Sequence, residues 1–159
     1  MMLDATAREA NVVDSWKKYL VDNLYKTEGI DLLFDRNLST PKIQGQTDTV
    51  TRWVTANFGS ISLSEMSDAM LMMFCCTRKD PEYYRLGQLR DTVMGYLTDN
   101  TQTDGMRRIT FYRSRSTGAW IPLDNGIIVQ DINESQRMDG PDGTKYKILN
   151  VRYRFSSKV

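Results

Sequence analysis

"AMLMMFCCTRKDPEYYRLGQLRDTVMGYL", residues 69–97, decides the fold because its hydrophobic pattern changes halfway along. Residues 69–76 are apolar without interruption. Such a run suits a buried strand or a helix, and the aromatic and cysteine residues before the stop at Asp80-Pro81 favour a central strand. Beyond Pro81 the apolar residues recur every three or four positions, which is typical of a helix with one buried face. The predicted core-facing residues are Leu86, Leu89, Val93 and Leu97.

The start of this second segment carries the signals of a helix N-terminus. Asp80 suits the N-cap, Pro81 the first helical position, and Glu82 the positive end of the helix dipole. The pattern therefore predicts a helix over about 80–98. Tyr83, Arg90 and Asp91 lie off its apolar stripe.

An amphipathic helix is also predicted at the N-terminal end, over about 5–27. Asp4 or Thr6 would cap it and Gly29 would end it. We expect Trp16 of this helix and Trp53 of the sheet to be buried. The apolar stripe consists of Val12, Val13, Trp16, Leu20 and Leu24.

The remaining chain is typical of strands and turns. Asn125-Gly126 and Asp142-Gly143 are strong turn dipeptides, and 38–48 has loop composition. The whole predicts one α+β domain, 1–159, with a mixed, mostly antiparallel β-sheet packed against two main helices (about 5–27 and 80–98). The first expected strands are 30–36, 49–59 and a central buried strand within 61–78. Residues 107–115 and 118–123 are expected to form a hairpin around 116–118. Two longer strands, 125–138 and 145–159, are joined by 139–144.

Composition gives no sign of a membrane or of a strongly charged partner. The net charge is +1, and no apolar run approaches the roughly 20 residues that span a bilayer. The start lacks the layout of a signal peptide, so we expect synthesis in the cytoplasm. Charge is uneven: residues 1–100 hold 11 basic and 14 acidic residues, a net −3, whereas 101–159 hold 10 and 6, a net +4.

The two cysteines, Cys75 and Cys76, are adjacent in the apolar run. Neighbouring side chains of a strand point to opposite faces, so these two are poorly placed to bridge each other. We expect buried reduced thiols, which indicates a reducing compartment.

The residues needed for common catalytic sites are missing. The chain has no histidine, which excludes Ser/His/Asp and Cys/His nucleophilic arrangements and the commonest metal ligand. No phosphate-binding glycine loop occurs. Asp131, Glu134, Asp139 and Asp142 have oxygen ligands for Mg²⁺ or Ca²⁺, but the favoured interpretation is a solvated hairpin end. We therefore predict no enzyme activity, no catalytic, metal or cofactor-binding residues, and no cofactor.

Arginine interleaved with aromatic residues is the most unusual feature, in "RRITFYRSR" (107–115) and "VRYRF" (151–155). Alternation places Arg108, Thr110, Tyr112 and Ser114 on one face, and Arg107, Ile109, Phe111, Arg113 and Arg115 on the other. Likewise Arg152 and Arg154 lie opposite Val151, Tyr153 and Phe155. Three interpretations stay open: a solvated sheet face, a protein-facing surface, or a site that stacks single-stranded nucleic acid.

The order of these segments resembles that of the small α+β tail-terminator (tail-completion) and neck proteins of long-tailed bacteriophages. The resemblance covers most of the chain and rests on layout and a few phrases, above all "TRKD…YRLGQLRDTV". The matching segments are "WKKYLVDNLY" (16–25), "FDR" (34–36), "TRWVTANFG" (51–59), "CTRKDPEYYRLGQLRDTVMGYLTD" (76–99), "WIPLDNGIIVQ" (120–130) and "YKILNVRYRFSSK" (146–158).

The resemblance implies a structural virion protein. Its subunits would form a homo-oligomeric ring, usually a hexamer, that caps the tail tube and joins it to the head-side connector. DNA would pass through the ring without specific binding, in agreement with the near-neutral charge. A connector subunit, a tail tube subunit and a small nucleic-acid-binding module are the alternatives.

On this interpretation the exposed side of the 80–98 helix contacts a neighbouring subunit. The alternative for Arg90 is a local pair with carboxylates on the Glu82 or Asp91 side. The predicted subunit and partner interface consists of Tyr83, Tyr84, Arg85, Arg90, Arg107, Arg108, Arg113, Arg115, Arg152 and Arg154.

Overall fold

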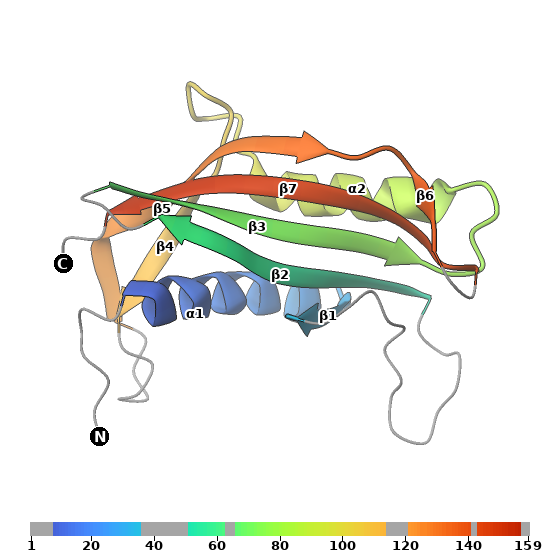
Figure 1. The fold of residues 1–159 in the computed structure, drawn as a ribbon, viewed down its shortest axis with the longest axis horizontal. Coiled ribbons are helices and arrows are strands. Elements are labelled where there is room, and N and C mark those ends of the chain that lie inside the picture. Colours follow the sequence, from blue (N-terminus) through green and yellow to red (C-terminus); the bar gives the residue numbers. More distant parts are fainter. Residues whose placement is uncertain (1–7, 36–50, 63–65, 114–120, 141–142, 157–159) are drawn as a thin grey trace, which may run out of the picture.

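A computed structural model describes residues 8–35, 51–62, 66–113, 121–140 and 143–156. Two helical segments and a curled sheet make up these residues (Figure 1). The elements are α1 (Arg8–Leu20), which continues as the π-helix η1 (Val21–Thr27), β1 (Asp31–Phe34), β2 (Arg52–Ser62), β3 (Met66–Thr77), α2 (Tyr84–Leu97), β4 (Arg108–Arg113), β5 (Ile121–Glu134), β6 (Met138–Asp139) and β7 (Lys145–Ser156).

The sheet is mixed and mostly antiparallel, which confirms the predicted α+β class. Its strand order is β1-β2-β3-β7-β5-β4, and the short β6 pairs with β7. Of the strand pairs within the described residues, only β1–β2 is parallel. The central strand is β3, as the apolar run of residues 69–76 predicts.

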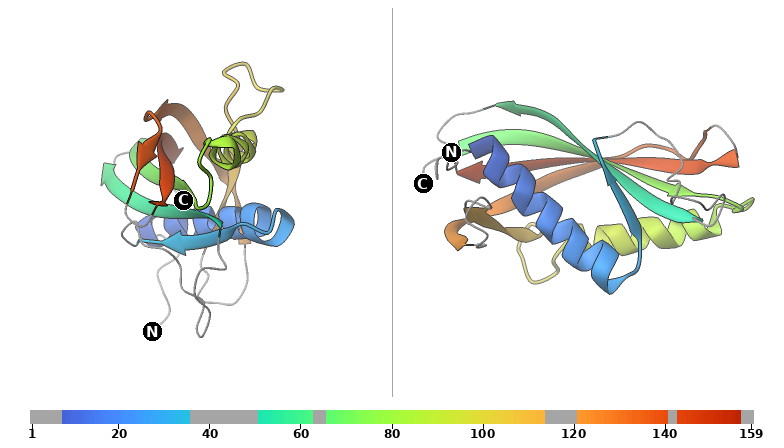
Figure 2. Two further views of the ribbon diagram at one scale, coloured as in Figure 1. Left: turned by 90° about the vertical axis from the view of Figure 1, so that its right-hand side faces the viewer. Right: turned by 90° about the horizontal axis from the view of Figure 1, so that it is seen from below.

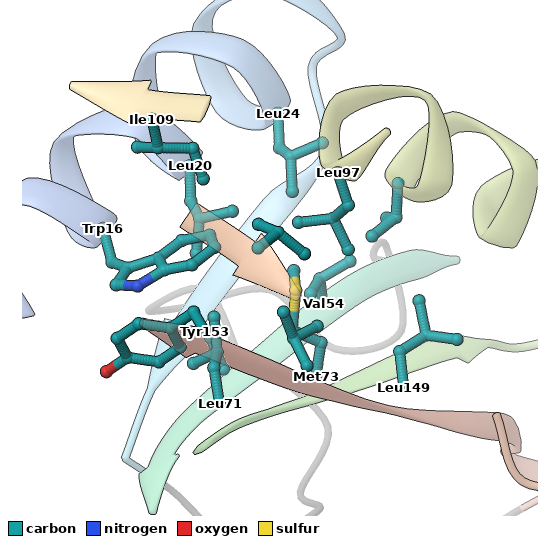
Figure 3. Packing of buried hydrophobic residues seen from close by; sticks show 14 of the residues in the cluster. Trp16, Leu20, Leu24, Val54, Leu71, Met73, Leu97, Ile109, Leu149 and Tyr153 are labelled. Atoms are coloured by element: carbon teal, nitrogen blue, oxygen red, sulfur yellow. The ribbon is translucent and has the colours of Figure 1, made fainter. Parts of the chain in front are cut away.

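Both helices pack on one face of this sheet and share a single core with it (Figure 2). The α2 stripe of Leu86, Leu89, Val93 and Leu97 is buried, as predicted. From α1, the Trp16 indole is fully buried and meets the Tyr153 ring edge-on, with 5.2 Å between ring centroids (Figure 3). This face of the sheet is therefore closed to solvent.

The opposite face, called here the outer face, carries a second small apolar cluster. Trp53 and Cys76 are fully buried in it, with Leu33, Phe74 and Tyr146 packed around them. Burial of Trp16 and Trp53 is thus confirmed. Cys75 and Cys76 are both buried and unbridged, and they lie on opposite faces of β3. Burial raises the pKa of the Cys75 thiol to about 12, which keeps it protonated and unreactive.

Helix α2 begins at Tyr84, four residues later than Asp80, so the predicted start was wrong. The residue before it, Tyr83, has φ 60° in the left-handed region, which a continuous helix from Asp80 cannot contain. Asp80 still caps the helix from outside: its carboxylate accepts the N–H groups of Leu86 at 2.8 Å and Arg85 at 3.2 Å. Pro81 lies in the intervening turn.

The first helical segment is described from Arg8 to Thr27, and the predicted caps Asp4 and Thr6 lie outside the described residues. Gly29 ends it with φ 67°, as expected. Its last seven residues form the π-helix η1 instead of a regular α-helix. The sequence pattern gave no sign of this change.

Asn125-Gly126 does not form the predicted turn, because both residues lie within the continuous strand β5. The pairing of β4 with β5 shifts there: Thr110 lies opposite Gly126, but Tyr112 lies opposite Pro122. The extra residues of β5 are accommodated as a bulge, so the chain keeps its direction. The predicted loop 38–48, the hairpin tip 116–118 and Asp142 lie outside the described residues.

Candidate assembly surfaces

The start of α2 presents an aromatic and a basic side chain to solvent. Tyr84 is 70% exposed and the Arg85 side chain is exposed, with no ion pair in the part of the chain that the structure describes. The preceding residue, Tyr83, is fixed: its hydroxyl donates to Asp139 at 3.0 Å, and the Lys145 ammonium lies 5.0 Å from its ring centroid. These contacts of Tyr83 hold the turn that precedes α2. Tyr84 and Arg85 at the helix start therefore have a defined position on the surface. We call them the α2 start surface.

Arg90 is already paired within the chain, and its place in the predicted interface stays a prediction. Its guanidinium donates to both carboxylate oxygens of Glu134, at 2.6 and 2.8 Å, and to Asp91 at 2.9 Å. Lys147 also reaches Glu134, at 3.2 Å. Arg90 therefore ties α2 to the end of β5 through Glu134, and its bond to Asp91 is the local pair that the alternative interpretation named.

The Arg90 contact also sets the charge state of its partner. Hydrogen bonding to Arg90 lowers the pKa of Glu134 from its ordinary 4.5 to about 2, although partial burial opposes the shift. The ionised pair thus stabilises the fold above about pH 4.5. That contribution is lost as the pH falls from about 4.5 toward 2.

We expect Glu134→Gln to lower the stability by about 1 kcal/mol at pH 7, because the pair is partly solvated. The difference from the unchanged protein should shrink as the pH falls toward 2 and vanish below it, where Glu134 is protonated in both states. Thermal unfolding across this pH range measures it, with Asp131→Asn, at an exposed carboxylate of the same strand, as the control. A difference that stays constant with pH contradicts the assignment.

Arg107 and Arg108 follow α2 in the sequence and lie near its C-terminal end. Arg107 donates from Nη2 to the Gly95 carbonyl oxygen at 2.9 Å, next to the negative end of the helix dipole. Arg108 pairs with Asp104 at 3.2 Å. Only the backbone of Arg113 is described, and Arg115 lies outside the described residues.

A second exposed tyrosine lies close to this end of α2. Tyr25 of η1 is 54% exposed. Nearby, Glu28 accepts a hydrogen bond from the Tyr96 hydroxyl at 2.6 Å, and Asp99 is the second residue after the end of α2. Neither carboxylate has an ion pair among the described residues. Tyr25, Glu28 and Asp99 together are called the α2 end surface.

The β7 arginines lie on the outer face, as the alternation predicts. Val151, Tyr153 and Phe155 are buried in the core, whereas Arg152 is exposed and Arg154 is half-buried. Arg154 pairs with Asp68 of β3 at 3.1 Å. The predicted interface residues whose side chains are described thus fall in three separate places: α2, the region that follows its end, and the outer face.

The outer face itself was missed in the sequence analysis. No helix in the described ranges covers it, yet several apolar side chains of its central strands lie there half-buried. The uninterrupted apolar run 69–76 was the available signal, since it is typical of a strand buried on both faces. The half-buried residues are Met70, Met72 and Phe74 of β3 and Tyr146, Ile148 and Asn150 of β7.

The described residues contain no cluster of three or more acidic or thiol side chains suited to a metal ion. Of the acidic residues considered above, Glu134 pairs with Arg90, and Asp139 pairs with Lys145. Asp131 is exposed on β5. None of the helices within the described ranges has the length and apolarity needed to cross a membrane.

A small polar cleft of about 230 Å³ lies between the first helical segment and β4. Its Lys18 ammonium is paired with Asp22 at 2.7 Å, and its Tyr19 hydroxyl donates to the Tyr96 carbonyl at 2.5 Å. These groups serve contacts within the chain. The lining residues are Lys18, Tyr19, Asp22, Asn23, Ile109, Thr110 and Tyr112.

No protein-family model matches the chain, and no curated protein does. Several solved structures are similar to this chain, and one of them has a TM-score of 0.60 over 94% of this chain and 96% of its own length. The two sequences are 9% identical. At this identity the likeness shows a shared fold and leaves the function open.

Proposed function

We propose that this protein is a structural ring subunit, of the tail-terminator type that caps a phage tail tube and joins it to the head-side connector. The observation that carries the proposal is the placement of the two most exposed large aromatic side chains among the described residues. Tyr84 and Tyr25 lie toward opposite ends of α2. A helix of 14 residues is about 21 Å long, so the two surfaces are well separated.

Two different surfaces on one subunit are what a closed ring requires, because neighbouring copies then meet head to tail. The α2 start surface is aromatic and positive through Arg85. The α2 end surface is aromatic through Tyr25 and offers the Glu28 and Asp99 carboxylates to Arg85, beside the Arg107 guanidinium whose charge acts on Asp99. Exposed tyrosine and arginine are common at the energetic centres of interfaces, and opposite charge fixes the register of the contact.

The proposal predicts that Arg85→Glu weakens the contact between ring subunits by about tenfold or more, since it places like charges together. The monomer should keep its stability because Arg85 has no ion pair among the described residues. The matched control is Arg152→Glu, the same reversal on the outer face, which should leave the ring contact intact. Analytical ultracentrifugation over a concentration series measures both. Equal association by the unchanged and Arg85→Glu chains rejects the α2 start surface.

The tail-end role is tested by adding the purified chain to tubes assembled from the tube protein of the same particle. Electron micrographs should show one ring at one end of each tube and an end to tube growth. Bare ends and continued growth contradict the proposal. A shift of labelled single-stranded DNA that weakens steeply with salt would favour the nucleic-acid-binding alternative.

A further inference from the structure

The outer face of the sheet is more apolar than a solvent-facing surface requires. A strand that has water on one side normally alternates apolar and polar residues. In β3, Met70, Met72 and Phe74 point to the outer face while Leu71, Met73 and Cys75 point into the helix-covered core. At one end of the outer face, Trp53 and Cys76 are already fully buried. A contiguous apolar patch of this kind marks a surface that packs on a partner.

We infer that a second copy of this chain covers the outer face, with the same face of each copy packed together about a two-fold axis. The register of β3 and β7 carries the inference. Phe74 of β3 lies opposite Ile148 of β7, so two apolar residues are paired there. The next outward pair joins Met72 to Asn150. Toward the other end of the ladder, Asp68 lies opposite Arg154. We place a two-fold axis over the outer face, midway between β3 and β7 and parallel to them. Rotation about this axis puts each of these β3 residues of one copy over its paired β7 residue of the other copy.

This arrangement makes the face complementary to itself. Phe74 of one copy meets Ile148 of the other, and Asp68 of one meets Arg154 of the other. The ion pair within each chain, at 3.1 Å, then becomes part of a network of four charges. Two sheets stack readily in this way with their strands within about 30° of each other. Self-complementary surfaces of this kind are the basis of two-fold dimers.

The charges on the outer face favour a protein copy over nucleic acid. Asp68 and Asp131 balance Arg152 and Arg154, and Asp131 lies directly opposite Arg152 in the sheet. The face therefore has no excess of positive charge for phosphates. The pairing uses a different surface from the ring contact at the two ends of α2, so it does not rest on the proposed function.

The test is sedimentation equilibrium of the full chain with Arg85→Glu, in which the proposed ring contact is weakened. We expect a concentration-dependent dimer. Adding Ile148→Lys, a charge at the centre of the outer face, should weaken the dimer by at least tenfold while circular dichroism shows an intact fold. Gln88→Lys on the exposed side of α2 is the matched control and should leave the dimer unchanged. Monomers throughout, or a dimer that tolerates Ile148→Lys, overturn the inference.

Cross-linking gives an independent measurement of the same contact. Asn150→Cys lies near the proposed axis and should be joined to its counterpart by a short bismaleimide. The native thiols are buried, so the unchanged chain is the blank, and Gln88→Cys should give no dimer. Absence of a cross-linked dimer at Asn150→Cys, or equal yields at both positions, contradicts the two-fold arrangement. If rings form normally while these results are negative, only this pairing fails and the proposed function stands.

Discussion

Replacing Trp16 with alanine should lower the free energy of unfolding by about 3–5 kcal/mol, the range for deleting a large aromatic side chain from a core. The Trp16 indole is fully buried and meets Tyr153 edge-on. Its N–H has no hydrogen-bond partner among the described residues, so the loss comes from packing and the cavity. Urea unfolding followed by far-ultraviolet circular dichroism measures it.

Trp16→Phe is the matched control, because it keeps an aromatic ring in the site and should cost distinctly less. Trp53→Ala on the outer face should also cost about 3–5 kcal/mol, since Trp53 is equally buried. Unchanged stability in both alanine variants would contradict the two-sided packing of the sheet.

Asp80→Ala should cost about 2–4 kcal/mol, because it removes a charged acceptor and leaves buried donors unpaired. The carboxylate accepts the N–H groups of Arg85 and Leu86 and the Thr77 hydroxyl. Burial alone would raise the pKa of Asp80, but these hydrogen bonds lower it below its ordinary 3.8. The ionised side chain therefore stabilises the fold above that pH, and the benefit is lost as the pH falls further.

Amide hydrogen exchange locates the effect of Asp80→Ala. Exchange at Arg85 and Leu86 should accelerate more than exchange at Val93, in the middle of α2. Asp80→Asn keeps one acceptor oxygen and should give an intermediate stability. Equal stability of all three chains would show that the helix start does not depend on Asp80.

Local patterns in the sequence predicted the parts of the fold that depend on local chemistry. The spacing of Leu86, Leu89, Val93 and Leu97 identified the buried side of α2, and alternation in 151–155 separated the outward arginines from the core residues. Both follow from the period of a helix or strand, which neighbouring residues set.

The errors arose where distant residues decide the outcome. Arg90 pairs with Glu134, which is 44 positions away, so no local spacing reveals the partner. Helix α2 begins at Tyr84 and not at the predicted Asp80. The turn before it is fixed by contacts of Tyr83 with Asp139 and Lys145, which come much later in the sequence. Asn125-Gly126 has turn chemistry, but Gly126 pairs with Thr110 of β4 and strand β5 continues through both residues.

The sequence alone only partly distinguishes exposed interface candidates from residues that make contacts within the chain. Arginine and tyrosine content marked the start of α2, where Tyr84 and Arg85 are exposed. The same signal also marked Arg107 and Arg154, which make contacts within the chain. Exposure and pairing, which depend on the complete fold, distinguish the two groups.

The ring proposal is tested most directly by a native mass spectrum of the purified chain across a concentration series, with negative-stain images of the largest species. Head-to-tail contact predicts a closed ring of about six copies, or two such rings paired through their outer faces. The Arg85→Glu chain should lose these species and keep only small ones. Monomers and dimers alone at every concentration, with no closed species in the images, would contradict a ring-forming subunit.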